Sequence, residues 1–150
     1  MPEFTPLCTL EVEVADPFDF GITPAGHRRV INIVGGSFSG SRMSGVVLGG
    51  GADWQIIRPD GVAVLDARYT LRTDAGDFIQ VTSQGLRHGP PEVIARLGRG
   101  ERVDPKLYYF RTVLRFEAGA ASLAWLNTII AVASGVRTRN LVELEAFELR

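Results

Sequence analysis

The fold is decided by "VAVLDARYTLRTDAGDFIQVTSQGLRH", Val62 to His88. Apolar and polar residues alternate along both arms, and "DAGD", Asp74 to Asp77, separates them. This pattern is typical of two antiparallel strands joined by a tight turn. The first arm has an apolar and a polar face, and the sequence leaves open which of them points inward. The apolar face carries Ala63, Leu65, Ala67, Tyr69 and Leu71, and the polar face carries Asp66, Arg68, Thr70 and Arg72.

The same alternation recurs along most of the chain. Cys8, Leu10 and Val12 share an apolar face in "LCTLEVEVA" near the N-terminus. Further strands are expected over residues 28–40, 44–49, 53–58, 107–119 and 141–150, and residues 123–138 should begin as a helical turn and continue as a strand. The strand over 28–40 should bend or bulge at its two central glycines and pair with 44–49, and "PDG", residues 59–61, should form a turn with a positive φ at the glycine.

A different composition marks the segment from His88 to Leu107. Two prolines precede a short helical pattern over Glu92–Leu97, and glycines follow it. We therefore expect a long surface loop that carries one short helix. Because the rest of the chain consists of short strands separated by turns, we predict an all-β fold. The expected architecture is a single antiparallel β-barrel domain over residues 1–150, with about eight to ten strands and room for one small ligand.

Charge and metal-ligating residues exclude several functions. The formal net charge is -1 and the basic residues are scattered singly, so no nucleic-acid partner is expected. Cys8 is the single cysteine, which excludes an internal disulfide and a cysteine metal cluster. His27 and His88 lie far apart without acidic neighbours at ligand spacing, so we predict no metal. No cofactor is expected, because the glycine-rich segments lack the Lys-Ser/Thr ending of a phosphate loop.

Hydropathy indicates a cytoplasmic protein with no membrane partner. The N-terminal segment is acidic where a secretory signal would be basic. The longest apolar stretch, Leu123 to Val136, is interrupted by Asn127 and is too short to span a bilayer as a helix.

Five segments in this order resemble an uncharacterised bacterial and fungal family, the domain of unknown function three-two-three-seven. They are "VGGSFSG", "GGGADWQIIRPDG", "LDARYTLRTDAG", "YYFRT" and "AWLN", and the resemblance covers the chain from about Leu7 to Leu149. The resemblance implies a compact antiparallel β-barrel, often seen as a homodimer, with no settled reaction. The family's recurring polar and aromatic positions correspond to Arg28, Asp53, Trp54, Asp66, Arg68, Tyr69, Tyr109, Arg111, Trp125 and Asn127.

Asp53 is the candidate acid or base. It follows three glycines and precedes Trp54, so its carboxylate could be partly desolvated, which would raise its pKa. The alternative is an ordinary turn residue that caps the backbone. Tyr69 and Tyr109 are candidate proton partners.

Arg68 and Arg111 are candidates for stabilising negative charge on a substrate. Arg68 does so only if the polar face of its strand points inward, and otherwise forms a solvated pair with Asp66. Arg111 shares a strand face with Tyr109, which suits an oxygen-rich ligand but also suits a structural ion pair.

Arg28, Trp54, Trp125 and Asn127 are candidate substrate-binding residues. Trp125 could stack on a ring and Asn127 could orient a carbonyl, although such residues are more often core and cap. The combined hypothesis is a small-molecule-binding barrel that acts as a cofactor-independent isomerase, lyase or cyclase on a carbonyl- or carboxylate-bearing compound. The alternatives are a barrel that binds a metabolite without changing it, and a dimeric structural or interaction domain.

Overall fold

The hairpin from Val62 to His88 forms a long uninterrupted strand pairing. In the computed structural model, which describes all 150 residues, β6 (Ala63–Thr73) pairs with β7 (Phe78–His88) in one continuous antiparallel register. The apolar face of β6 points inward, since Leu65, Tyr69 and Leu71 are buried. The polar face, with Arg68, lies outside, which answers the question that the sequence left open.

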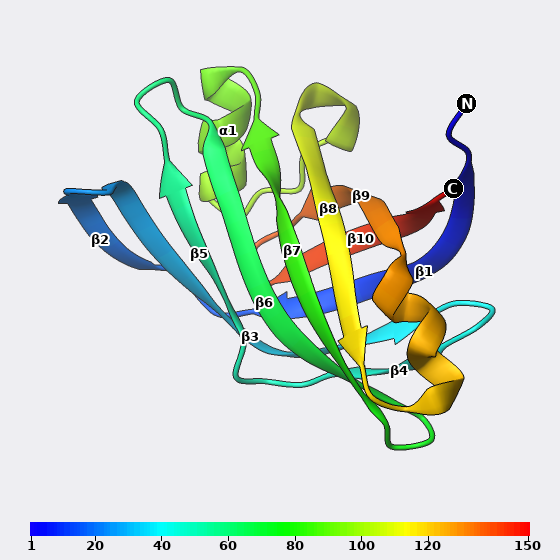
Figure 1. Cartoon of the computed structure of the whole chain (residues 1–150). Coiled ribbons are helices and arrows are strands. Elements are labelled where there is room, and N and C mark those ends of the chain that lie inside the picture. Colours follow the sequence, from blue (N-terminus) through cyan, green and yellow to red (C-terminus); the bar gives the residue numbers. More distant parts are fainter.

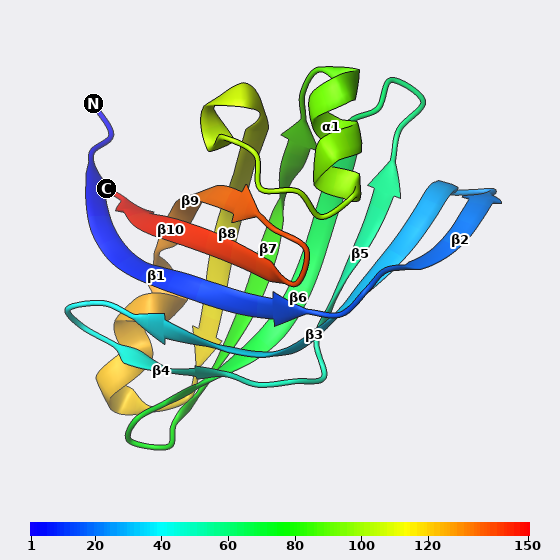
Figure 2. The same ribbon diagram turned by 180° about the vertical axis from the view of Figure 1, so that it is seen from behind.

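The ten strands form one antiparallel sheet in which eight strands close into a barrel and two are additional, so the predicted β-barrel is confirmed (Figure 1). β4 and β5 together fill one place between β6 and β3, β3 pairs in turn with β1, and β2 extends the sheet beyond the barrel. Figure 2 shows β1 beside β10, an arrangement that brings the two termini together. The other strands are β1 (Phe4–Val14), β2 (Phe18–Thr23), β3 (Gly26–Ser39), β4 (Ser44–Val47), β5 (Ala52–Ile57), β8 (Tyr109–Ala118), β9 (Ile130–Arg137) and β10 (Leu141–Leu149).

The long strand β3 changes partners at its glycines. It pairs with β5 as far as Asn32 and with β4 from Ser37 onward. The register with β1 shifts at the same place, between Glu13 and Val14, and Gly36 adopts a φ of 136°. A side chain on Gly36 would collide with the Glu11 carbonyl, with the Cβ 2.0 Å from the oxygen. The predicted bend is confirmed, and the predicted turn glycine Gly61 has a φ of 88°.

Short helices lie at the two ends of the barrel. The predicted helix in the loop after β7 forms as α1 (Pro91–Gly98), and it lies by the end of the barrel where β7 ends (Figure 1). A 3₁₀ helix, η1 (Pro105–Leu107), leads into β8. A second 3₁₀ helix, η2 (Ala121–Thr128), precedes β9 and buries Leu123 and Leu126. No helix has the length and apolarity that crossing a membrane would require.

The barrel interior is the hydrophobic core. Leu10, Leu71, Ile79 and Leu114 are fully buried, and all four come from inward-facing positions of different strands. Cys8 lies in this core as a free thiol, and burial raises its pKa to about 12. It is therefore a core residue and no nucleophile.

Candidate functional site

The barrel interior opens at the end next to α1. A cavity of about 60 Å³ lies between the strands there and is lined mainly by apolar side chains. Above it, between α1 and the strand ends, lies a wider chamber of about 570 Å³. Arg87 and Arg137 line both spaces, so the cavity and the chamber meet at these two side chains. We call this end the mouth.

Asp53 is the acidic residue that lines the inner cavity. Its Oδ2 accepts a hydrogen bond of 3.0 Å from Gln55 Nε2, and its Oδ1 accepts one of 2.9 Å from the backbone N–H of Asp66. Burial raises the pKa of Asp53, although the two hydrogen bonds and the charges of Arg87 and Arg137 oppose this effect.

The backbone around Asp53 explains why this carboxylate is held so firmly. The pairing of β5 with β6 includes Asp53 opposite Ala67 and Ile56 opposite Val64 but is open at Trp54 and Gln55 between them. On one side of this opening the Asp53 carboxylate accepts a hydrogen bond from the Asp66 N–H. On the other, Arg28 Nη1 donates a hydrogen bond of 2.9 Å to the Trp54 carbonyl. Asp53 is thus a strand residue whose carboxylate accepts a backbone N–H where the pairing of β5 with β6 is interrupted. The alternative that it caps the preceding glycine turn is not met.

Three arginines surround the mouth without acidic partners. Arg29, Arg87 and Arg137 have no carboxylate oxygen within 4.0 Å, and their guanidinium groups make no hydrogen bond within the protein. Burial lowers the pKa of Arg87. Burial, followed by the charges of Arg87 and Arg29, lowers the pKa of Arg137 to about 10, which still leaves it protonated at neutral pH.

Two hydroxyl groups inside the cavity also lack partners. Tyr69 and Thr112 are buried and line the cavity, and neither hydroxyl oxygen has a hydrogen-bond partner. Burial raises the pKa of Tyr69, so its phenol stays protonated and remains a donor. An unpaired buried hydroxyl is costly, and a polar ligand atom would remove that cost.

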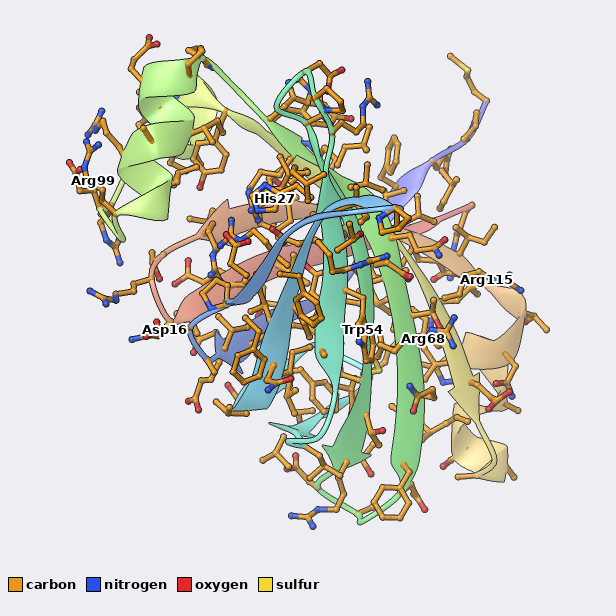
Figure 3. The ribbon with its side chains drawn as sticks, turned by 90° about the vertical axis from the view of Figure 1, so that its left-hand side faces the viewer. Asp16, His27, Trp54, Arg68, Arg99 and Arg115 are labelled. Atoms are coloured by element: carbon orange, nitrogen blue, oxygen red, sulfur yellow. The ribbon has the colours of Figure 1, made fainter.

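The predicted group of Asp53, Arg68, Tyr109 and Arg111 is not brought together. Asp53 faces the cavity, as does Tyr69, whereas Arg68, Tyr109 and Arg111 lie exposed on the outer surface. Figure 3 shows Arg68 and Trp54 on the outer face of the strands. The outward placement follows from strand parity, because the inward positions of β6 and β8 are the apolar alternates.

Tyr109 and Arg111 form a cluster outside the barrel. Tyr109 stacks on His88 with ring centroids 4.9 Å apart, and the Arg111 guanidinium lies 5.5 Å from the Tyr109 ring. Arg111 Nη1 also donates to the Phe110 carbonyl.

The four expected substrate-binding residues lie away from the cavity. Arg28 holds the Trp54 carbonyl, and the Trp54 indole is 41% exposed. Trp125 packs against the core at the opposite end, under the guanidinium of Arg42 at 3.5 Å. Asn127 uses its side-chain amide to bond both the N–H and the carbonyl of Ala118. Arg28, Trp125 and Asn127 therefore make structural contacts, and none of the four residues lines the cavity.

Comparison with known proteins places the chain in a family. A family model described as protein of unknown function (DUF3237) matches residues 2–149. The chain belongs to this family. Among related sequences, a UPF0311 protein of Rhodopseudomonas palustris is 40% identical over 141 residues, which cover 94% of this chain and 92% of the relative. A UPF0311 protein of Clostridium acetobutylicum is 40% identical over 124 residues, covering 83% and 78% of the two chains.

Solved structures show the same barrel. A conserved protein of unknown function from Rhodopseudomonas palustris aligns with a TM-score of 0.93 at 37% identity and covers 100% of this chain and 98% of its own. A β-barrel-like protein from Acinetobacter baumannii aligns with a TM-score of 0.87 at 39% identity, covering 100% and 97%. A structure from Penicillium herquei, described as that of an enzyme, has a TM-score of 0.74 at 18% identity, covering 99% and 95%, and shares the fold.

The sequence did contain a signal for the mouth arginines of this DUF3237 protein. Arg87 continues the inward parity of Ile79 and Val81, and Arg137 continues that of Ala131 and Ala133. Arg29 likewise precedes Ile31 and Ile33 at two-residue spacing. A charged residue that extends an apolar strand face lies at the rim of the barrel, where it can reach both solvent and cavity.

Proposed function

We propose that this DUF3237 protein binds a small carbonyl- or carboxylate-bearing molecule at the mouth and transforms it by proton transfer, without a cofactor. The observation that carries the proposal is Asp53, a carboxylate with a raised pKa that faces a cavity between unpaired arginines. The reaction type is that of an isomerase, lyase or cyclase.

Asp53 is suited to the role of general base. Each carboxylate oxygen accepts one hydrogen bond, which leaves further lone pairs available to a ligand. A raised pKa strengthens a carboxylate as a base when it is ionised. Its two donors, Gln55 and the backbone of Asp66, fix its orientation.

The charge that proton removal creates has stabilising groups nearby. When Asp53 takes a proton from the carbon next to a carbonyl, the C–H electron pair forms a carbon–carbon double bond and the carbonyl oxygen becomes an enolate. Arg87 and Arg137 line the same cavity and supply positive charge to that oxygen. Asp53 then returns the proton at another atom, which gives isomerisation, or the enolate expels a leaving group, which gives elimination.

Two further features support the proposal. The unpaired hydroxyls of Tyr69 and Thr112 can donate to a ligand oxygen inside the cavity. The structure from Penicillium herquei that shares this fold is described as an enzyme, so the barrel architecture is compatible with catalysis.

A binding barrel without chemistry is the second candidate, because the same unpaired hydroxyls would serve a ligand that is held unchanged. Hydrogen–deuterium exchange distinguishes the two. Pyruvate, acetoacetate and a phenolic ketone are incubated with the protein in deuterated buffer, and loss of the proton signal next to the carbonyl is followed by NMR.

We expect exchange above the buffer rate for at least one compound, and a decrease of about a hundredfold or more in Asp53→Asn, because general-base catalysis is lost. Asp77→Asn, at the turn before β7, is the matched control and should keep the full rate. Compounds that bind without exchanging would assign the barrel to binding alone.

A further inference from the structure

The three mouth arginines are held close together in spite of their like charges. The charge of Arg29 lowers the pKa of both Arg87 and Arg137, and the charge of Arg87 also lowers that of Arg137. Neither the side chains nor the backbone of the protein supply an acceptor to their guanidinium groups. This arrangement is unfavourable in the empty protein, and an anion at the mouth would relieve it.

Other arginines around the chamber are paired, so the lack of partners is specific to the three. Arg99 Nε lies 2.7 Å from a carboxylate oxygen of Glu101, and Arg139 Nε lies 4.0 Å from one of Asp16. These pairs sit on the exposed rim, whereas Arg87 and Arg137 reach down to the inner cavity. The rim charges are neutralised within the protein and the inner ones are left for a ligand.

Counting charge then defines the ligand class. Asp16, the one carboxylate that lines the chamber, is paired with Arg139, so three guanidinium groups and the Asp53 carboxylate remain along the two spaces, an excess of two positive charges even when Asp53 is ionised. We propose that Arg29, Arg87 and Arg137 form a binding site for a small dianionic oxyanion, of the dicarboxylate or phosphate monoester class. The planar guanidinium fork matches the oxygen pairs of both groups.

The positions of the inner cavity and the chamber define where such a ligand would lie. Its charged group sits where Arg87 and Arg137 separate the chamber from the cavity, with Asp53 on the cavity side. The remainder extends into the chamber of about 570 Å³, since the inner cavity of about 60 Å³ has room only for a small group. This inference rests on the proposed function for the choice of pocket, and it restricts the substrates of that pocket to acidic molecules.

The test is calorimetric titration of the full chain with malonate, inorganic phosphate and acetate at about pH 8, where phosphate is largely dianionic. Ionic strength is kept equal with sodium chloride, because screening weakens all charge interactions. The variants are Arg87→Gln and Arg137→Gln. The matched control is Arg115→Gln, which removes an exposed arginine from the outer face of β8 (Figure 3).

We expect malonate or phosphate to bind at least about tenfold more tightly than acetate, and each mouth variant to lose about tenfold or more in that affinity. The control should bind as the unmodified protein does. Preference for malonate indicates a dicarboxylate ligand, and preference for phosphate indicates a phosphate monoester. Both mouth variants should melt at the same or a higher temperature without ligand, since one repelling charge is gone.

Equal binding of acetate and the dianions, or dianion binding unaffected by both mouth variants, would overturn the inference. The outcome is independent of the proton-transfer proposal. Dianion binding without deuterium exchange on any compound leaves the site intact and removes the catalytic proposal. Deuterium exchange on a compound, without any preference for dianions in the titration, leaves the catalytic proposal intact and removes the dianion site.

Discussion

The two ends of the barrel are built on opposite principles. At the end closed by η2, Leu126 is fully buried, Arg42 lies over Trp125, and Asn127 satisfies the backbone of Ala118. At the mouth, guanidinium groups have neither hydrogen-bond nor acidic partners, and two buried hydroxyls have no hydrogen-bond partner. Long strands such as β6 and β7 run from one end to the other, so the difference between the ends lies largely in the side chains. The closed end stabilises the fold, and the mouth keeps polar groups available at some cost in stability.

The largest expected effect lies at the closed end. Leu126→Ala removes a fully buried side chain and should lower the free energy of unfolding by about 2–5 kcal/mol, measured by urea denaturation. Leu107→Ala, at a position 48% exposed, should change it by less than about 0.5 kcal/mol. Malonate affinity should be the same in both variants. A loss of less than about 1 kcal/mol in Leu126→Ala would show that η2 does not close the barrel by packing.

At the mouth, Asp53→Asn should increase the free energy of unfolding, whereas Leu126→Ala lowers it, and the increase should depend on pH. Because burial raises the pKa of Asp53 in the folded state, ionising it disfavours folding. The stabilising effect of its proton is complete below the unfolded-state pKa and is lost as pH rises through the folded-state pKa. The variant lacks this loss, and Gln55 can turn its unpaired Oε1 toward the new amide.

The stability of Asp53→Asn relative to the unmodified protein should therefore increase from about pH 3 to pH 8, as measured by urea denaturation at each pH. Asp77→Asn should show no such trend. A relative stability that falls over this range would mean that Asp53 is a structural carboxylate stabilised by its charge.

Two tyrosines give a paired test of smaller size. Tyr69→Phe removes a buried hydroxyl without a partner and should raise the unfolding free energy by up to about 1 kcal/mol. Tyr108→Phe removes a hydroxyl that accepts a hydrogen bond of 3.0 Å from the backbone N–H of Arg137, and should lower the unfolding free energy by about 0.5–1.5 kcal/mol. Thermal or urea unfolding measures both, and equal losses would contradict the claim that Tyr69 is unpaired.

The smallest effects are expected on the outer face. Arg68→Ala and Arg111→Ala should each change the unfolding free energy by less than about 0.5 kcal/mol and leave malonate affinity unchanged. Calorimetric titration beside urea denaturation checks both. A tenfold weaker affinity in either variant would move the ligand site to the outside of the barrel.

Much of the fold could be predicted because strand parity and turn residues act locally. The hairpin of β6 and β7, the helix α1 and the switch from η2 to β9 all followed from such patterns. The strand β2 did not, because nearly all of its residues, "FDFGIT", are exposed and no buried face imposes an alternation.

The site was predicted only in part, and Asp53 and Tyr69 show why. The sequence singled both out by their chemistry, and the structure places both on inward positions that line the cavity. Arg68 and Arg111 have equally suitable chemistry but the opposite parity, and only closure of the barrel determines which parity faces inward. Strand parity marks Arg29, Arg87 and Arg137 one by one, but they come from three strands that are distant in the chain, and no local pattern specifies that they line one chamber.

The most direct test of the central claim, that the mouth is a preorganised site for acidic ligands, is the titration of the Asp53 carboxyl carbon by NMR. It is followed in chloride and in sulfate at equal ionic strength, because sulfate stays dianionic throughout the titration. The account predicts a pKa above the ordinary aspartate value in chloride, because of burial, and a further rise in sulfate, because a bound anion disfavours the nearby carboxylate. A pKa at or below the ordinary value, unchanged by sulfate, would contradict it.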